Sequence, residues 1–189
     1  MKRALSSAAN DATSPPRGHR RLLRVGLLGL AGAALALLLL TAAHRPQLRL
    51  LWNASASVPL GLYRIEPGAP PRIGDLVALR PSPALGRFMA ERRYVEANAL
   101  LIKPVAAVSG ATVCRVGDRV TIDAQIVADA LPRDRFGRAL PRWSGCRRLP
   151  ADQLFLIAPA HRDSFDSRYF GPVDRRQIVG RAFPLWTWS

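Results

Sequence analysis

The sequence predicts a mainly β domain carried by a single N-terminal transmembrane helix. Two observations lead to this fold class. Residues 25–43 form an uncharged, apolar run, and a helix of that length spans roughly 28 Å at about 1.5 Å per residue, close to the thickness of the hydrocarbon core. After residue 60 the apolar runs are short and are bounded by Gly, Pro and Asp, which is typical of β structure.

The tail before the apolar run predicts the orientation of the chain. Residues 1–24 carry six Lys and Arg residues against one acid, Asp11, and show no apolar periodicity. We therefore expect a disordered cytoplasmic tail, an anchor over residues 25–43, and an outer domain over residues 44–189. A cleaved signal peptide is the alternative, but its apolar core usually has only about 7–15 residues.

Eight short apolar runs predict the strands of the outer domain. Residues 83–99 are the best candidate for a helix, residues 116–120 predict a turn between two strands, and residues 131–150, rich in Arg, Pro and Gly, predict an exposed loop or subdomain. The predicted strands are residues 61–65, 75–80, 100–108, 111–116, 119–123, 125–128, 153–158 and 177–183.

The charge of the chain is a weak indication of its partners. The formal net charge is +15, with 28 basic residues, but only Lys2 and Lys103 are lysines. Such an arginine bias usually reflects genomic composition, and no helix-turn-helix, zinc-finger or RNA-binding pattern accompanies it, so we expect no nucleic-acid partner. Lys103 is the only lysine beyond the tail, which suggests a task that arginine cannot perform, since arginine stays protonated.

The surroundings of Lys103 favour a general base. Its neighbours in "ALLIKPVAAV" are almost all apolar, so a strand that turns this side chain inward would lower the pKa of its amine. A base at neutral pH needs a drop of roughly 3 units, or about 4 kcal/mol. A neutral amine can accept the proton of a serine hydroxyl, which is a poor nucleophile by itself. The alternative is a lysine that reaches solvent along its flexible stem.

A polar stretch near the C-terminus, "DSFDSRYFGPV" at residues 163–173, gathers hydroxyls, an acid and an arginine. By itself it predicts a polar turn, in which Asp166 and Arg168 form a surface ion pair worth under about 1 kcal/mol. Motifs for a nucleophile elbow, a zinc protease or a P-loop are absent. His161 is the only histidine well inside the outer domain, so a Ser-His-Asp triad has little support.

The two cysteines, Cys114 and Cys146, are too far apart for a CxxC redox pair and lack the histidines that a zinc site needs. On the outer side of a membrane they can form a disulfide that closes a loop of about 32 residues and stabilises the fold by roughly 3–4 kcal/mol. Two buried free thiols are the alternative.

Taken together, these stretches resemble the boxes of the serine-lysine signal peptidases. In that family the nucleophilic serine follows a membrane anchor and precedes a proline, as Ser57 does in "SASVPLG". The general-base lysine lies in a strand, as Lys103 does in "LLIKPVAAVSG". A third box, S-x-D-S-R-x-x-G, matches residues 164–171, and "IVGRA" at 178–182 matches the closing strand.

The resemblance implies roles for several other residues. The hydroxyl of Ser55 would line an oxyanion hole together with the backbone N–H of Ser57. Ser164 would orient the lysine amine, and Asp166 and Arg168 would form a structural ion pair in the third box. Neither a cofactor nor a metal is expected.

Details of the boxes resemble the conjugative-transfer branch, the TraF-type peptidases. Val58 and Pro59 directly follow the nucleophile, and the middle box has Lys-Pro where the housekeeping enzymes have Lys-Arg. The resemblance implies a serine endopeptidase, single-pass in the inner membrane with a periplasmic catalytic domain, that removes leader peptides from exported precursors. A conjugative pilin precursor would be its substrate. Three alternatives remain: a housekeeping type I signal peptidase, a catalytically inactive anchored binding module, and a basic membrane-surface or DNA-transfer scaffold.

Tryptophans at both ends of the outer domain predict a contact with the lipid bilayer. Trp52 follows the apolar run, and Trp186 and Trp188 lie in the final segment "FPLWTWS". Indole rings favour the headgroup region, where an apolar ring and a polar N–H are both accommodated. Alternatively, these rings belong to the core, or the final segment is frayed.

Overall fold

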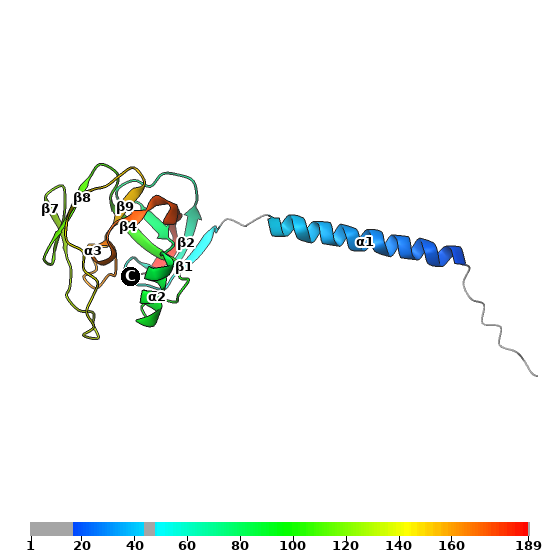
Figure 1. Ribbon diagram of the computed structural model, residues 1–189, viewed down its shortest axis with the longest axis horizontal. Coiled ribbons are helices and arrows are strands. Elements are labelled where there is room, and N and C mark those ends of the chain that lie inside the picture. Colours follow the sequence, from blue (N-terminus) through cyan, green and yellow to red (C-terminus); the bar gives the residue numbers. More distant parts are fainter. Residues whose placement is uncertain (1–16, 44–47, 189) are drawn as a thin grey trace, which may run out of the picture. The chain divides into compact units, whose positions relative to one another are not determined.

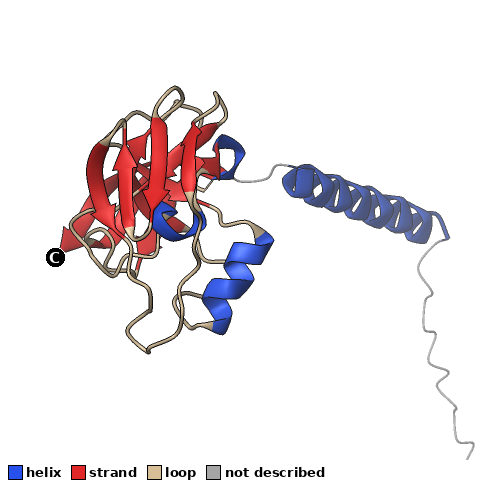
Figure 2. Ribbon diagram, turned by 60° about the vertical axis from the view of Figure 1, so that its left-hand side comes forward, coloured by secondary structure: helices blue, strands red, loops and turns tan. Residues whose placement is uncertain are grey.

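The computed structural model describes residues 17–43 and 48–188 (Figures 1 and 2). Contacts divide the chain into two compact units, Met1–Pro46 and Gln47–Ser189. The described part of the first unit is one helix, and the second unit contains two antiparallel sheets with short helices between strands. The prediction of a mainly β fold is therefore confirmed.

The helix of the first unit, α1 (Arg17–Ala43), covers the apolar run predicted at residues 25–43. It begins at Arg17, so the prediction of a disordered tail is wrong for residues 17–24, where Arg and Leu are strong helix formers. Residues 1–16 of the predicted tail lie outside the described residues. Within the described ranges, no helix combines the length and the apolar character that crossing a bilayer requires.

The larger sheet of the second unit has seven antiparallel strands in the order β1-β2-β11-β3-β4-β9-β10. Five of them contain the predicted apolar runs, whereas β1 and the two-residue β10 were not predicted. The strands are β1 (Leu50–Asn53), β2 (Leu60–Glu66), β3 (Leu76–Leu79), β4 (Leu101–Ala107), β9 (Gln153–Leu156), β10 (Val173–Asp174) and β11 (Ile178–Trp188).

The smaller sheet has four strands in the order β7-β6-β5-β8. Three match predicted strands, β5 (Thr112–Val116), β6 (Arg119–Ile122) and β7 (Gln125–Asp129). The fourth, β8 (Gly145–Arg148), lies inside residues 131–150, so the prediction of a loop is wrong there. All its residues are exposed, so the segment carries no apolar alternation, and its extended form comes from pairing with β5.

Short helices connect the strands. α2 (Pro83–Glu91) begins after the N-cap Ser82 and ends well before residue 99, the predicted end. The chain leaves the helix where Arg93 adopts a φ of 57°, a conformation that cannot continue a right-handed helix. α3 (Ser167–Phe170) lies in the polar stretch and is capped by Asp166, and a 3-10 helix, η1 (Arg175–Gln177), precedes β11.

An apolar cluster joins the two sheets. Ala107 of β4 and Phe155 of β9 pack with Val113 of β5 and Val120 of β6, and all four are fully buried. The smaller sheet is thereby held against the strand that carries Lys103.

The three terminal tryptophans gather on the surface of the larger sheet. Trp52 lies 5.5 Å from Trp188, and Trp188 lies 5.6 Å from Trp186, measured between ring centroids. Their exposed fractions are 53% for Trp52, 68% for Trp186 and 45% for Trp188. These rings are outside the core, and the segment that carries Trp186 and Trp188 is part of β11.

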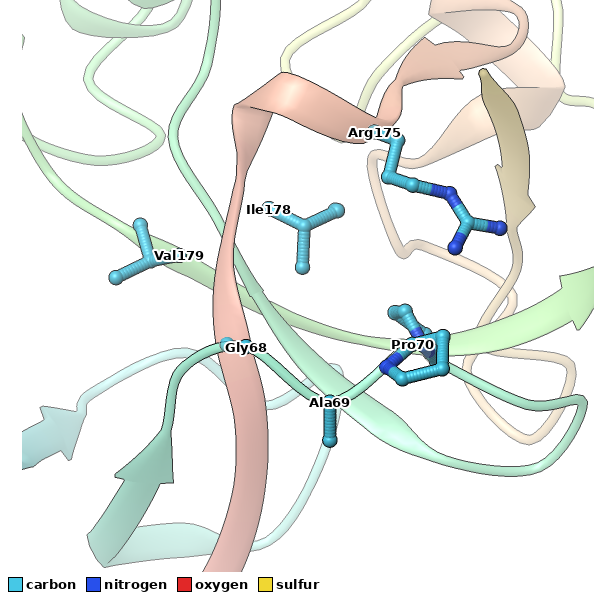
Figure 3. A pocket seen from close by; sticks show the side chains of 8 residues that line it. Gly68, Ala69, Pro70, Arg175, Ile178 and Val179 are labelled. Atoms are coloured by element: carbon cyan, nitrogen blue, oxygen red, sulfur yellow. The ribbon is translucent and has the colours of Figure 1, made fainter. Parts of the chain in front are cut away.

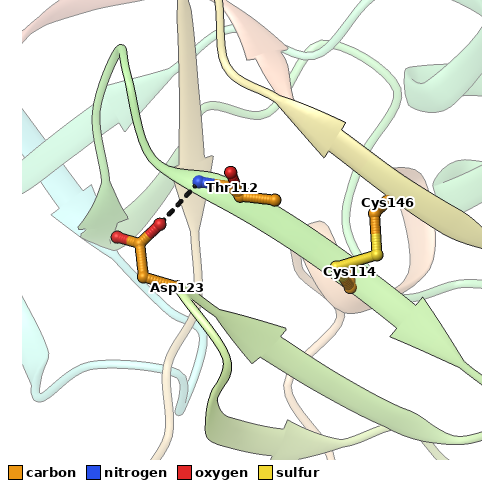
Figure 4. The surroundings of a disulfide bond; sticks show 4 residues. All are labelled: Thr112, Cys114, Asp123 and Cys146. Carbon is orange, nitrogen blue, oxygen red and sulfur yellow. Dashed lines mark hydrogen bonds between the residues drawn. A yellow bond between two sulfur atoms is a disulfide. The ribbon is translucent and has the colours of Figure 1, made fainter.

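The two cysteines form a disulfide between neighbouring strands (Figure 4). Cys114 of β5 and Cys146 of β8 are direct cross-strand partners. At the start of β5, the backbone N–H of Thr112 donates to Asp123 Oδ1 at 2.8 Å. The bond thus ties β8, which contributes no buried residue, to the rest of the smaller sheet.

We expect the double variant Cys114→Ser, Cys146→Ser to lose stability. Removing a bond across a sequence separation of 32 frees loop-closure entropy in the unfolded chain, at a cost of about 3–4 kcal/mol in the free energy of unfolding. Urea titration measures the loss, and reduced wild-type protein is the control that should match the variant. Two free thiols in peptides prepared without reductant, identified by mass spectrometry, would contradict the bond.

Candidate active site

Ser57 lies in the Ser57 loop, defined here as residues 54–59, which joins β1 to β2. Asn53 and Gly61 are the last paired residues of these strands. Gly61 has a φ of 131°, and a Cβ on it would collide with the main-chain carbonyl of Trp186 on β11. Only glycine permits both the backbone conformation and this close approach, so the glycine of "PLGLY" determines where the loop ends.

Lys103 lies in β4, between β3 and β9, with Val77 as its cross-strand neighbour. Its exposed fraction is 3%, so it does not reach solvent along its stem. Burial lowers the pKa of the amine from 10.5 to about 8, and the smaller effects of Asp166, which raises the pKa, and Arg168, which lowers it, oppose one another. No described carboxylate lies within ion-pair distance of Lys103.

Three polar side chains from distant parts of the chain meet at the Lys103 amine. Lys103 Nζ donates to Ser57 Oγ at 2.5 Å and to Ser164 Oγ at 2.9 Å. Ser164 Oγ in turn donates to Ser57 Oγ at 3.1 Å. These three residues were singled out from the sequence, and the fold brings them into one hydrogen-bonded group.

The segment after Ser164 is held by a buried ion pair. Arg168 Nε and Nη2 donate to the two carboxylate oxygens of Asp166, each at 2.8 Å, and both side chains are almost fully buried. The interpretation as a surface pair is therefore wrong. Arg168 also donates to the carbonyl oxygens of Ala158, His161 and Arg162, so the pair organises the whole turn.

A strand of the smaller sheet and the segment just before β8 support the same turn through two residues that were not predicted from the sequence. Arg115 of β5 is fully buried, and its Nη1 donates to the carbonyl oxygen of Arg168 at 2.6 Å. Trp143 Nε1 donates to the carbonyl oxygen of Ser167 at 3.1 Å. A signal was available, because strand alternation places Arg115 on the same inward face as Val113.

The structure shows the surroundings of the two donors that the resemblance assigns to an oxyanion hole. The backbone N–H of Ser57 takes part in none of the backbone hydrogen bonds between described residues outside the regular elements. The hydroxyl of Ser55, however, donates to Asn53 Oδ1 at 3.0 Å. The sequence analysis did not consider Asn53, although it stands in the same short motif.

Two hollows in the described chain lie away from this group. One of about 340 Å³ is lined by residues of the smaller sheet, and one of about 200 Å³ lies between residues 68–71 and residues 175–180 (Figure 3). Neither is lined by Ser57, Lys103 or Ser164. Because both lie away from these three side chains, we assign neither hollow to a substrate.

The chemistry available to the site is acyl transfer. A buried amine with a lowered pKa, within hydrogen-bond reach of a serine hydroxyl, is an arrangement that activates serine for attack on a carbonyl carbon. Among the described residues, no three His, Cys, Asp or Glu side chains gather as metal ligands would.

Comparison with known proteins agrees with this chemistry. The family described as "Signal peptidase, peptidase S26" matches residues 22–188. The "Plasmid transfer protein TraF" of Escherichia coli is 34% identical over 170 residues, which cover 84% of this chain and 93% of that protein.

Two further relatives are a TraF protein and a signal peptidase I. The "Conjugal transfer protein TraF" of Agrobacterium tumefaciens is 39% identical over 179 residues, covering 89% of this chain and 97% of that protein. The "Signal peptidase I" of Leptolyngbya laminosa is 31% identical over 114 residues, covering 60% of this chain and 51% of that protein. The family model matches most of this chain, and the match to the two TraF relatives covers nearly the whole length of each. The chain therefore belongs to the S26 family of signal peptidases.

Proposed function

We propose that this protein is a serine endopeptidase in which Ser57 and Lys103 form a catalytic dyad that cleaves leader peptides from exported precursors. The observation that carries the proposal is the Lys103 amine, buried without a carboxylate partner among the described residues and 2.5 Å from Ser57 Oγ. Burial lowers the pKa of this amine to about 8, so a usable fraction is neutral at physiological pH, as a general base requires.

The dyad acts by moving one proton in each half-reaction. The neutral Lys103 amine takes the proton of the Ser57 hydroxyl while Oγ attacks the scissile carbonyl carbon, and the charged amine then protonates the leaving amine of the substrate. In the second half-reaction the neutral Lys103 amine takes a proton from a water that attacks the acyl carbon, and it returns this proton to Ser57 Oγ as the ester bond breaks and the acyl product leaves. Ser164, 2.9 Å from Lys103 Nζ, orients the amine, and the backbone N–H of Ser57, with the hydroxyl of Ser55, stabilises the oxyanion.

The substrate is a precursor used in conjugation. The supporting observation is that several relatives at 34–39% identity are named for plasmid or conjugal transfer. A conjugative pilus is built from exported subunits, so a pilin precursor fits both the family and these names. The housekeeping alternative is a weaker candidate, because the relative named signal peptidase I matches over only 51% of its own length.

The site works at the surface of the inner membrane. Residues 25–43 are uncharged and follow a basic tail, which favours an anchor with a cytoplasmic N-terminus and a periplasmic catalytic domain. The exposed cluster of Trp52, Trp186 and Trp188 supports contact with the lipid headgroups. Such contact would present the dyad to precursors that are themselves embedded in the membrane.

Three substitutions test the dyad. Ser57→Ala, Lys103→Ala and Lys103→Arg should each abolish cleavage of a pilin precursor while thermal melting shows a folded domain. Lys103→Arg should be as inactive as Lys103→Ala, because a guanidinium stays protonated. Lys2→Arg, at the only other lysine, is the matched control and should keep full activity. Appreciable turnover by a folded Lys103→Arg variant would rule the dyad out.

The pH dependence tests the role of the amine. Only the neutral amine is active, and its pKa is about 8. The kcat/KM of cleavage should therefore rise about tenfold per pH unit below this value and level off above it. Steady-state rates between about pH 6 and pH 9.5 measure the profile. A rate that falls or stays constant as the pH rises through 8 would contradict a lysine base.

The tryptophan cluster is tested with the full chain in lipid vesicles. The triple variant Trp52→Ala, Trp186→Ala, Trp188→Ala should cleave membrane-embedded precursor more slowly, while its rate on a short soluble peptide of the same sequence stays unchanged. Ile126→Ala, which also removes an exposed apolar side chain, is the control and should change neither rate. An equal loss on both substrates would show that the cluster supports the fold or the site instead of the membrane contact.

A further inference from the structure

Asn53 is a buried polar residue that the proposed mechanism does not use. It is the last residue of β1, its exposed fraction is 5%, and it faces Gly61 across the strand pair. A buried amide has to satisfy its hydrogen-bonding groups within the protein. The hydrogen-bond partners of the Asn53 side chain all lie in the Ser57 loop.

The amide of Asn53 is the centre around which the loop is folded. Its Nδ2 donates to the carbonyl oxygens of Ser55 at 2.9 Å, Val58 at 3.2 Å and Pro59 at 3.0 Å. Its Oδ1 accepts the backbone N–H of Ser55 at 3.2 Å and the Ser55 hydroxyl at 3.0 Å. These contacts lie on both sides of Ser57 in the sequence and leave Ser57 itself untouched.

The contacts require both halves of an amide. Three carbonyl oxygens need N–H donors, and the N–H and O–H of Ser55 need an acceptor, so a carboxylate or a hydroxyl satisfies only part of the set. The loop has no regular ladder to satisfy these groups, and leaving them unpaired in a buried place is unfavourable. Tyr63 adds a second support, because its hydroxyl donates to the carbonyl oxygen of Pro59 at 2.7 Å.

Asn53 also governs the state of Ser55. A hydroxyl carries a single proton, and that of Ser55 is directed at Asn53 Oδ1. The hydroxyl therefore has to turn away from Asn53 before it can donate to an oxyanion. Asn53 thus holds the hydroxyl of Ser55 within the Ser57 loop between turnovers.

We propose that Asn53 is a positioning residue of the reaction, which sets the placement of Ser57 against Lys103 and holds the Ser55 hydroxyl in reserve. This inference rests on the proposed function of the dyad. Its consequence is that loss of the amide should reduce the chemical step and leave substrate binding nearly unchanged, because the Asn53 side chain is buried and contacts the loop rather than the reacting atoms.

The first test is Asn53→Ala in the full-length protein, with steady-state cleavage of a pilin precursor. A misplacement of the nucleophile of about 1 Å costs about 100-fold, so we expect kcat to fall by about that factor with KM changed by less than about threefold. Asn98→Ala, at an exposed asparagine, is the matched control and should behave as wild type. A folded Asn53→Ala variant with wild-type kcat, or with its loss in KM alone, would overturn the inference.

The second test is Asn53→Asp, which keeps the shape and removes the donors. An ionised carboxylate would face three carbonyl oxygens, whereas its protonated form regains one donor. The ratio of the kcat of the variant to that of the wild type should therefore be larger at about pH 6 than at about pH 9. This trend is opposite to that of the wild-type rate, which rises with pH as Lys103 loses its proton. A ratio independent of pH would count against the inference.

Two controls separate the possible failures. Thermal melting at each pH shows whether the variants are folded at the assay temperature, and if both are unfolded, Asn53 supports the whole domain and the inference is wrong. Ser57→Ala and Lys103→Arg are assayed alongside. If these two are active, the proposed dyad fails; if they are inactive while Asn53→Ala is fully active, only the role of Asn53 fails.

Discussion

The site depends on the burial of a single amine. Lys103 sits in a central strand of the larger sheet with an exposed fraction of 3%, where a charged ammonium is poorly solvated. No described carboxylate within ion-pair distance compensates for this, so desolvation lowers the pKa to about 8. The polar groups around Lys103 therefore have to hold the amine in place without raising its pKa again.

The ion pair of Asp166 and Arg168 shows how charged groups can lie near Lys103 while their effects on its pKa oppose one another. The turn that carries Ser164 needs strong hydrogen bonds to hold its shape, and a lone buried carboxylate there would have raised the pKa of Lys103. Arg168 engages both carboxylate oxygens of Asp166, and the two charges act on Lys103 in opposite directions. The pair therefore holds the turn while its two charges oppose one another at the amine, which fits a role in support of the proposed base.

Two different parts of the fold hold the partners of Lys103. Arg115 of the smaller sheet and Trp143, which precedes β8, hydrogen-bond to the α3 segment. The disulfide ties β8 to β5, the strand of Arg115. On the other side, the amide of Asn53 organises the loop that carries Ser57. Two serines thus contact the amine. The segment of Ser57 is held by the buried Asn53 and that of Ser164 by the buried Arg115, and each of these side chains donates hydrogen bonds to main-chain carbonyl oxygens.

The sequence by itself determined the β character, the positions of most strands along the chain, and, through the family resemblance, the three stretches that contain Ser57, Lys103 and Ser164. Alternation, turn residues and a single conspicuous lysine are visible along the chain, whereas Ser57 and Ser164 stand out only because their stretches resemble the boxes of the family. Only the tertiary structure decided that β8 is a strand, that Asp166 and Arg168 are buried, and that Asn53 and Arg115 support the site. The physical reason is that a hydrogen bond to a main-chain carbonyl can be made by any residue type that carries a donor, so its partner is defined by the folded chain and not by the local sequence.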